Sequence, residues 1–327
     1  MRSRLKPRRA RAATGRVVLI VGATSGIGLA TAVAFAGRAD KLVLVSRSAE
    51  ALDAAETACR RAGAAEVDTL AADIAAPEAA ARLVARTVAR HGRIDVVVHT
   101  AAVMGYGSVE AMPAEVFTAV VDTAVHGTVH LARAVLPVMR SRHAGTFIGV
   151  NSLLGSITVP QMGAYAVSKW GQRAVLRTLQ QETRDEPGVS VCIVSPGSIN
   201  TPIYYQAANY TGHAVRPPRP VLAPERVAAA ITRLADRPRR HVSVPVGPGN
   251  PLVITGFRLL PRLYDRLVGP LLQLAVLTPG RWRRTPGTVH HPAPVRERIH
   301  GRWPAPPEEQ VLTMPTDPAT DTPAARS

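Results

Sequence analysis

Cysteine is scarce in this sequence. Cys59 and Cys192 are the only two among 327 residues, and neither has a second cysteine or a cluster of histidines near it. This spacing excludes a disulfide framework and a zinc site built on CxxC pairs. Unpaired cysteines are typical of a reducing compartment, so we expect a cytoplasmic protein.

Long apolar runs are also missing. A membrane-spanning helix needs about 18 uninterrupted apolar residues, and no window of the sequence approaches that length. The arginine-rich start leads into a short apolar run, 17–21, and then into a glycine-rich turn instead of a cleavage site, so we do not expect an export signal. Aromatic residues make up only 4% of the chain, which predicts an aliphatic core.

Acidic residues are outnumbered. The chain has 40 Lys and Arg against 23 Asp and Glu, a formal net charge of +17, and residues 1–12 are basic without any acid. Two interpretations follow: a solvated tail, or a contact with anionic lipid or nucleic acid. No nucleic-acid reader motif accompanies the charge, so a specific nucleic-acid partner is not expected. Contact with the inner face of a membrane stays open as an alternative.

From Arg16 onward, short aliphatic runs alternate with longer alanine-rich stretches. The predicted strands are 16–22, 41–46, 66–71, 94–99, 145–151, 189–195 and 241–245. The predicted helices are 27–38, 48–62, 77–91, 113–139, 163–184 and 224–236. Repeated βαβ units predict an α/β fold, a single Rossmann-like doubly wound parallel sheet of about seven strands in the order 3-2-1-4-5-6-7. Ligands of such a sheet bind at the carboxyl ends of the strands.

The same pattern divides the chain into four parts. A basic disordered tail, residues 1–13, precedes a Rossmann-fold domain over residues 14–250. Residues 251–284 are apolar with arginines at helical spacing, which predicts an amphipathic helical extension. The part 251–279 could cap the core, pair with a second subunit or lie on a membrane. Residues 285–327 are rich in proline and lack periodicity, which predicts disorder.

A glycine-rich turn follows the first strand. Gly22, Gly26 and Gly28 would allow a tight turn and a close approach of a pyrophosphate, whose charge the free N–H groups of the next helix would meet. The position of the turn between the first strand and the first helix indicates a dinucleotide site more than a purely structural turn. The predicted cofactor contacts in this turn also include Thr24, Ser25 and Ile27.

The residue that follows the second strand indicates which nucleotide binds. An acidic residue there would bond the adenosine ribose of NAD, but the sequence has Arg47. A guanidinium pairs well with phosphate oxygens, so NADP is favoured over NAD, with a solvated arginine at a strand end as the alternative. After the third strand, Asp73 could reach the adenine ring or cap the following turn, and its neighbour Ile74 is a predicted contact as well.

Three residues carry the strongest chemical signal. Ser152 follows the fifth strand, and Tyr165 and Lys169 begin a long helix. Positions four apart share a helix face, so the Lys169 ammonium could lower the pKa of the Tyr165 hydroxyl from about 10 towards neutral pH. The tyrosine would then exchange a proton during hydride transfer, and Lys169 could also bond the nicotinamide ribose. Ser152 could donate a hydrogen bond to the substrate oxygen as negative charge develops there.

Together with the pair Pro196-Gly197, these residues resemble the short-chain dehydrogenase/reductase family, in its branch with the TGxxxGxG and YxxxK motifs. The resemblance covers about residues 14–250. It implies an NADP(H)-dependent oxidoreductase that transfers a hydride between nicotinamide and a ketone or secondary alcohol, with Tyr165 as general acid/base. It also implies a homodimer or homotetramer, and a substrate-binding lid over 202–222 whose tyrosines favour an apolar substrate. The further cofactor contacts that it implies are Thr100, Ala101, Pro196, Gly197, Ile199 and Thr201.

Three positions depart from the family pattern. Val21 replaces a threonine, and residues 99–102, His-Thr-Ala-Ala, replace Asn-Asn-Ala-Gly. Ala124 stands where the family has an asparagine that holds a water of the proton relay, a role that His126, Thr123 or bulk water could take over. These departures leave an alternative function, a non-catalytic NADP-binding or scaffold protein of the same fold.

Overall fold

The computed structural model describes residues 15–239, 243–247, 249–278 and 283–302. The predicted basic tail, the first two residues of the predicted strand 241–245 and residues 303–327 lie outside these ranges. Within them, no helix is both long enough and apolar enough to cross a membrane.

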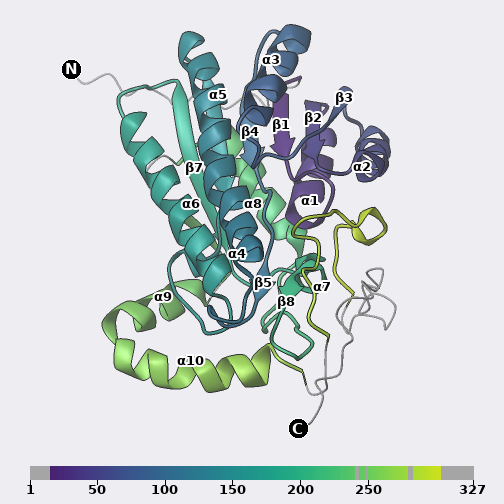
Figure 1. Cartoon of the computed structure of the whole chain (residues 1–327). Helices are drawn as coiled ribbons and strands as arrows, with labels where there is room; N and C mark the ends of the chain where they lie inside the picture. Colours follow the sequence, from purple (N-terminus) through teal and green to yellow (C-terminus); the bar gives the residue numbers. More distant parts are fainter. Residues whose placement is uncertain (1–14, 240–242, 248, 279–282, 303–327) are drawn as a thin grey trace, which may run out of the picture.

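Seven strands form the central sheet. They are β1 (Val17–Val21), β2 (Lys41–Ser46), β3 (Glu66–Ala71), β4 (Val96–His99), β6 (Gly145–Val150), β7 (Val189–Pro196) and β9 (Ser243–Val246). Their order is β3-β2-β1-β4-β6-β7-β9, and every neighbouring pair is parallel. The predicted doubly wound sheet and its strand order are therefore confirmed (Figure 1). A separate parallel pair, β5 (Gly105–Tyr106) and β8 (Ala208–Asn209), was not predicted, because two residues are too short to show a period.

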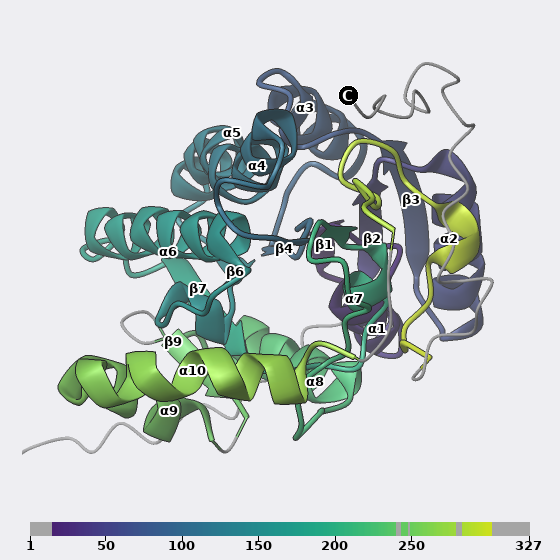
Figure 2. The ribbon, with the colours of Figure 1, turned by 60° about the horizontal axis from the view of Figure 1, so that its bottom comes forward.

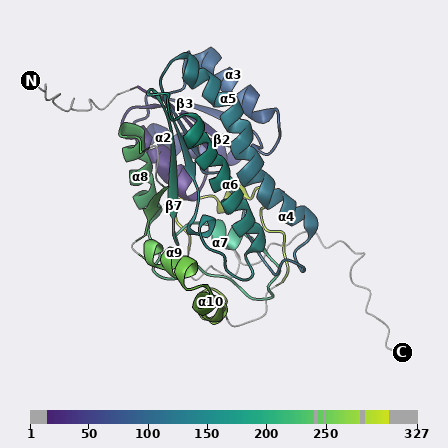
Figure 3. The ribbon, with the colours of Figure 1, turned by 90° about the vertical axis from the view of Figure 1, so that its left-hand side faces the viewer.

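Helices cover both faces of this sheet (Figure 3). One face carries α1 (Gly26–Ala36), α2 (Ala49–Arg61) and α8 (Pro224–Asp236), and the other carries α3 (Ala79–His91), α4 (Ala114–Val121), α5 (Gly127–Ser141) and α6 (Gly163–Glu182). A strand between two helical layers is buried on both sides, which explains why all five residues of β1 are aliphatic and buried. The result is one aliphatic core on each face of the sheet.

The predicted helix 113–139 has a wider turn in its middle. Between α4 and α5, residues Asp122–His126 form a π-helical turn, in which the Gly127 N–H donates to the Asp122 carbonyl five residues earlier. Such bulges are common at functional sites. Ala124, the position of the family asparagine, lies in this turn.

The chain after β9 crosses the carboxyl edge of the sheet. The predicted extension forms two helices, α9 (Asn250–Leu259) and α10 (Pro261–Ala275), and Figure 2 shows α10 lying across this edge. Asn250, which is buried, attaches α9 to β7 by donating from its side chain to the Ser195 carbonyl at 3.3 Å. The extension therefore packs next to the edge where ligands of this fold bind.

Residues 283–302 differ from the predicted disorder of 285–327. They run past α2 and the short helix α7 (Ile203–Gln206), and Val289 is buried (Figure 2). Asn209 and Thr285 exchange two backbone hydrogen bonds, of 2.8 and 3.0 Å, so this stretch is held by pairing with distant residues. Its order does not come from local periodicity, which is why the sequence pattern predicted none.

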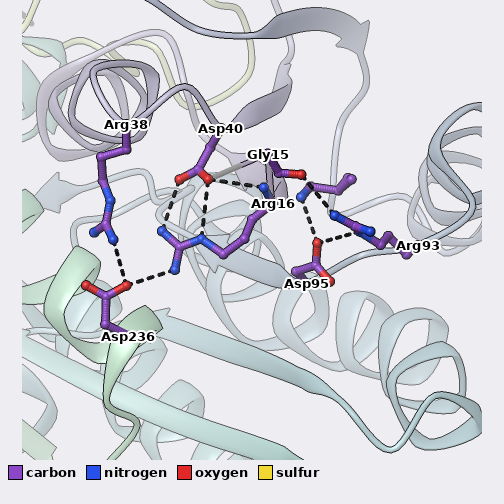
Figure 4. Close-up of polar contacts among 8 residues, drawn as sticks. Gly15, Arg16, Arg38, Asp40, Arg93, Asp95 and Asp236 are labelled. Atoms are coloured by element: carbon purple, nitrogen blue, oxygen red, sulfur yellow. Dashed lines mark hydrogen bonds and ion pairs between the residues drawn. The ribbon is translucent and has the colours of Figure 1, made fainter. Parts of the chain in front are cut away.

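An ion-pair cluster closes the opposite, amino-terminal edge of the sheet (Figure 4). Arg16, just before β1, pairs with Asp40 at 3.0 Å and with Asp236 of α8 at 3.0 Å. The Asp40 side chain is fully buried, and breaking such a pair leaves an uncompensated buried charge. Asp95 accepts from the Val17 N–H at 2.9 Å. These charges hold strand ends together, and the opposite edge carries the cavities.

Candidate active site

Two adjacent cavities open at the carboxyl edge of the sheet. The first has a volume of about 160 Å³ and lies at the glycine turn. The second has a volume of about 620 Å³ and is walled largely by apolar side chains of the lid, α9 and α10. Ile27, Thr100 and Thr201 line both cavities, so the two adjoin.

Every residue that the sequence predicts for cofactor binding or catalysis lines one of these cavities. The first is lined by Gly22, Thr24, Ser25, Gly26, Ile27, Gly28, Arg47, Asp73, Ile74, Thr100, Ala101 and Thr201. The second is lined by Ser152, Tyr165, Lys169, Pro196, Gly197 and Ile199. The structure therefore brings residues from distant parts of the chain to one site.

The turn between β1 and α1 has no room for side chains at two of its glycines. Gly22 has a positive φ of 85°, and a Cβ there would lie 2.6 Å from the Ala101 nitrogen. A Cβ on Gly28 would overlap the Gly22 carbonyl. The Thr100 hydroxyl, in the altered stretch 99–102, donates to the carbonyls of Val21 at 2.8 Å and Gly22 at 3.0 Å and so ties β4 to the turn. The backbone N–H groups of this turn at the start of α1 fit a dinucleotide phosphate.

Two predicted contacts near the adenosine end have other partners in the structure. Arg47 donates to the carbonyls of Val289 at 2.6 Å and Thr288 at 2.7 Å. The Asp73 carboxylate accepts from the Ala75 N–H at 3.0 Å, so it caps a turn while it faces the cavity. Of the two contacts predicted for Asp73, the structure therefore contains the cap of the following turn.

Tyr165 lies at the start of α6 and lines the larger cavity. The side chain is buried, and the Ser152 hydroxyl forms a hydrogen bond with the Tyr165 hydroxyl. Burial raises the pKa of Tyr165, and the bond to Ser152 only partly offsets this rise. The Tyr165 hydroxyl is therefore neutral in this arrangement.

The Lys169 amine forms hydrogen bonds with groups of β6 and α6. Its Nζ donates to the Val150 carbonyl at 3.2 Å and to Gln172 Oε1 at 3.0 Å, and lies 5.7 Å from the centre of the Tyr165 ring. The side chain is 1% exposed, and burial lowers the pKa of Lys169 to about 7. Desolvation is the largest cause of both pKa shifts in this arrangement, so the lowering of the Tyr165 pKa by Lys169 stays a prediction.

A buried polar chain connects Lys169 to the π-helical turn. Gln172 Nε2 donates to the Thr128 hydroxyl at 3.2 Å, and that hydroxyl donates to the Ala124 carbonyl at 2.6 Å. Gln172 and Thr128 were not predicted, although Gln172 lies three residues after Lys169 and Thr128 four residues after Ala124, on the same helix faces. These hydrogen bonds link α6 to Ala124, the position at which the family has an asparagine.

The histidines near this turn differ in their roles. His126 is exposed and pairs with Asp122 at 2.7 Å, while the Thr123 hydroxyl donates to the Ala119 carbonyl at 2.9 Å, so neither is directed to Lys169. His99, at the end of β4, is fully buried, and neither ring nitrogen has a hydrogen-bond partner among the described residues. Burial and the charge of Lys169 lower the pKa of His99 to about 3, so its ring is neutral.

A family profile and two similar proteins indicate the same family. A family profile described as short chain dehydrogenase matches residues 16–209. The chain is 33% identical over 201 residues to dehydrogenase/reductase SDR family member 7B of Bos taurus, which covers 60% of this chain but only 62% of the bovine protein. It is 31% identical to sepiapterin reductase of Chlorobaculum tepidum, over 69% of this chain and 92% of that protein.

A solved structure shares the fold. The crystal structure of a metagenomic short-chain oxidoreductase in complex with NADP superposes with a TM-score of 0.60 at 27% sequence identity, over 72% of this chain and 97% of the other.

We expect Lys169→Met to change how stability depends on pH in the cofactor-free protein. The native pKa of about 7 lies below the ordinary value of 10.5, so between these pH values the unfolded chain binds more protons than the native one. Wild-type stability should therefore rise with pH across this window, whereas the variant lacks this contribution. Urea unfolding at about pH 7 and about pH 9.5 should show a relative wild-type gain on the order of 1–3 kcal/mol.

Lys41 provides the control, because its side chain is 40% exposed and pairs with Glu66 at the sheet edge. Lys41→Met should not remove the rise in stability with pH. An identical pH dependence in the wild type and Lys169→Met would contradict the buried amine.

Proposed function

Because the chain belongs to the short-chain dehydrogenase family, we propose that it is an oxidoreductase that transfers a hydride between NADP(H) and a ketone or secondary alcohol. The single observation that carries the proposal is the position of the bonded pair Ser152 and Tyr165, in an apolar cavity that adjoins the glycine turn. When bound, the nicotinamide supplies or accepts the hydride.

Tyr165 would move the proton. In the reducing direction its neutral hydroxyl donates a proton to the substrate oxygen as the carbonyl carbon receives the hydride, so ketone, hydride and proton together give the alcohol. The Ser152 hydroxyl donates a hydrogen bond to the same oxygen while negative charge develops on it. Lys169, with a pKa of about 7, can hold or release a proton at Nζ near neutral pH, and Gln172 holds this amine in position.

The preference for NADP over NAD is supported by Arg47, which lines the cavity at the glycine turn. A guanidinium can pair with a 2′-phosphate, and no acidic residue follows β2 to bond a free ribose hydroxyl. Similarity to an oxidoreductase crystallised with NADP is consistent with this preference.

The larger cavity supports an elongated apolar substrate. Its volume of about 620 Å³ is within the range of about 300–1,000 Å³ that is typical of small-molecule sites. Its wall away from Tyr165 includes Leu260, Leu263, Leu267 and Leu271 of the α9–α10 region. Few polar groups line this far end, so a long hydrocarbon would lose little hydration on binding there.

The same helices support a contact with a membrane surface. Leu252, Leu259 and Leu274 are 73–78% exposed and do not line the cavity, so burial in the site does not account for them. Exposed arginines lie beside them at 258, 262 and 266. Leucines with neighbouring arginines suit the boundary between acyl chains and anionic headgroups. Self-association through α6, where Val167 and Trp170 are exposed, stays a prediction.

Tyr165→Phe should abolish turnover and leave cofactor binding nearly unchanged. The variant loses only the hydroxyl that moves the proton, so kcat/KM should fall about 10²-fold or more. NADPH oxidation with a panel of long-chain ketones and aldehydes measures the loss, and NADPH fluorescence measures binding. Tyr210→Phe is the control, because it removes the hydroxyl of a tyrosine that lines neither cavity, and it should keep full activity. Cofactor binding without wild-type turnover would instead support the non-catalytic alternative.

Arg47→Ala should reduce the preference for NADPH. The ratio of kcat/KM with NADPH to that with NADH should fall about 10-fold or more, because a charge-assisted pair with the 2′-phosphate is lost. The ratio is the informative quantity, because losing the Arg47 bonds to residues 288–289 would change kcat/KM with NADPH and with NADH alike. An unchanged ratio would remove Arg47 from the 2′-phosphate site.

The double variant of Leu252 and Leu274 to Glu should lose membrane binding. Co-sedimentation with vesicles that contain anionic phosphatidylglycerol should fall about 10-fold, because two leucines that would enter the acyl region are replaced by carboxylates that anionic lipid repels. The matched control changes Val109 and Val295, which are 65% and 86% exposed elsewhere, to Glu. Equal loss in both variants, or binding that does not depend on anionic lipid, would contradict this contact.

A further inference from the structure

The cavity at the glycine turn is partly filled by the chain itself. Thr288, Pro292, Ala293 and Glu297 form part of its wall, opposite the turn. The remaining volume of about 160 Å³ is below the range of about 300–1,000 Å³ typical of ligand sites. Residues 283–302, here called the C-terminal strap, therefore occupy space that a dinucleotide would need.

The strap bonds the first N–H of α1. The Gly26 N–H donates to the Arg298 carbonyl at 2.9 Å. This N–H is among the free donors at the start of a helix, where phosphate oxygens bind in folds of this kind. The strap thus supplies the acceptor that a pyrophosphate would otherwise provide.

The strap also engages the one cation predicted to hold the 2′-phosphate. Both terminal nitrogens of Arg47 donate to strap carbonyls, at 2.6 and 2.7 Å. A guanidinium in these two bonds must release at least one of them to form a bidentate pair with phosphate. The strap and the cofactor would therefore use the same donors.

Glu297 adds a negative charge at the same place. Its carboxylate forms a hydrogen bond with Thr24 of the turn and lies near Arg47, while Oε2 is buried without a hydrogen-bond partner among the described residues. Burial raises the pKa of Glu297, and Thr24 and Arg47 partly offset this rise. Cofactor phosphates placed beside this carboxylate would be repelled, since like charges in a poorly solvated site cannot both ionise at low cost.

The strap is anchored outside the cavity. Val289 is 2% exposed and packs with Val103, Met112 and Ala208 in an apolar cluster. The Thr288 N–H donates to the Gln206 carbonyl at 2.8 Å, next to the pairing of Thr285 with Asn209. The docked position therefore depends on specific contacts with the lid region.

From these contacts we infer that the C-terminal strap is a built-in competitor of the cofactor, which binds only when the strap leaves the glycine turn and Arg47. The inference rests on the proposed function, because it requires that NADP(H) binds at this turn. Docking and cofactor binding are then mutually exclusive, so the apparent cofactor affinity is reduced in proportion to the undocked fraction. Any partner that holds the strap away would activate the enzyme.

Amide hydrogen exchange of the full chain tests this, with and without NADP⁺. Competition predicts slower exchange in residues 22–28 and faster exchange in residues 284–302 when NADP⁺ is added. Slower exchange in the turn with slower or unchanged exchange in the strap would overturn the competitor and leave the proposed function standing. Unchanged exchange in the turn at saturating NADP⁺ would reject the proposed cofactor site, and the competitor with it.

Two substitutions test the direction of the effect. Glu297→Gln removes the charge, and Val289→Ala weakens the anchor, so each should bind NADP⁺ more tightly, by about 5-fold, as the undocked fraction grows. Val295→Ala is the matched control, because Val295 lies in the strap but is 86% exposed, and its affinity should match the wild type. Thermal unfolding of each variant verifies that the protein is folded. Weaker or unchanged affinity in both folded variants would overturn the proposal.

Discussion

Parallel strand pairing is the constraint on which the rest of this molecule depends. Because β1, β4, β6 and β7 run in the same direction, their carboxyl ends meet at one edge of the sheet. Residues that are more than 100 positions apart, such as Gly22 and Ser152, therefore reach the walls of adjoining cavities. At the opposite edge, Arg16 pairs with the buried Asp40 and with Asp236, and these ion pairs hold strand ends together.

Desolvation sets the electrostatics of the site. Tyr165, Lys169 and His99 are almost fully buried, and for each of them burial is the main cause of the pKa shift. All three shifts favour the neutral form. In such a poorly solvated site, a preorganised donor such as Ser152 acts on developing charge where water cannot compete.

The C-terminal region covers both halves of the site in different ways. Helices α9 and α10 wall the apolar cavity and expose leucines on the outside, whereas the strap lies against the glycine turn and Arg47. The two parts join through the pairing of Val215 with Leu277 and of Asn209 with Thr285, both in or near the lid. The walls of both cavities are thus connected to residues 202–222 through adjoining stretches of chain.

Local patterns in the sequence were sufficient for much of this description. The alternation of aliphatic runs and alanine-rich stretches predicted the sheet and its strand order. A strand that is buried on both faces, such as β1 or β7, has an apolar run that can be recognised in the sequence. The glycines at 22, 26 and 28 and the Tyr165 and Lys169 spacing predicted which residues would line the cavities, because each motif depends on a short stretch of backbone. Only the tertiary structure decided that Lys169 bonds to Gln172 and that residues 283–302 dock on Arg47. It also decided that the buried ring of His99 has no hydrogen-bond partner within the described part of the chain. These features depend on contacts between distant residues, which produce no periodic pattern in the sequence. They also depend on desolvation, because the pKa of a buried group is set by how completely the surrounding residues exclude water.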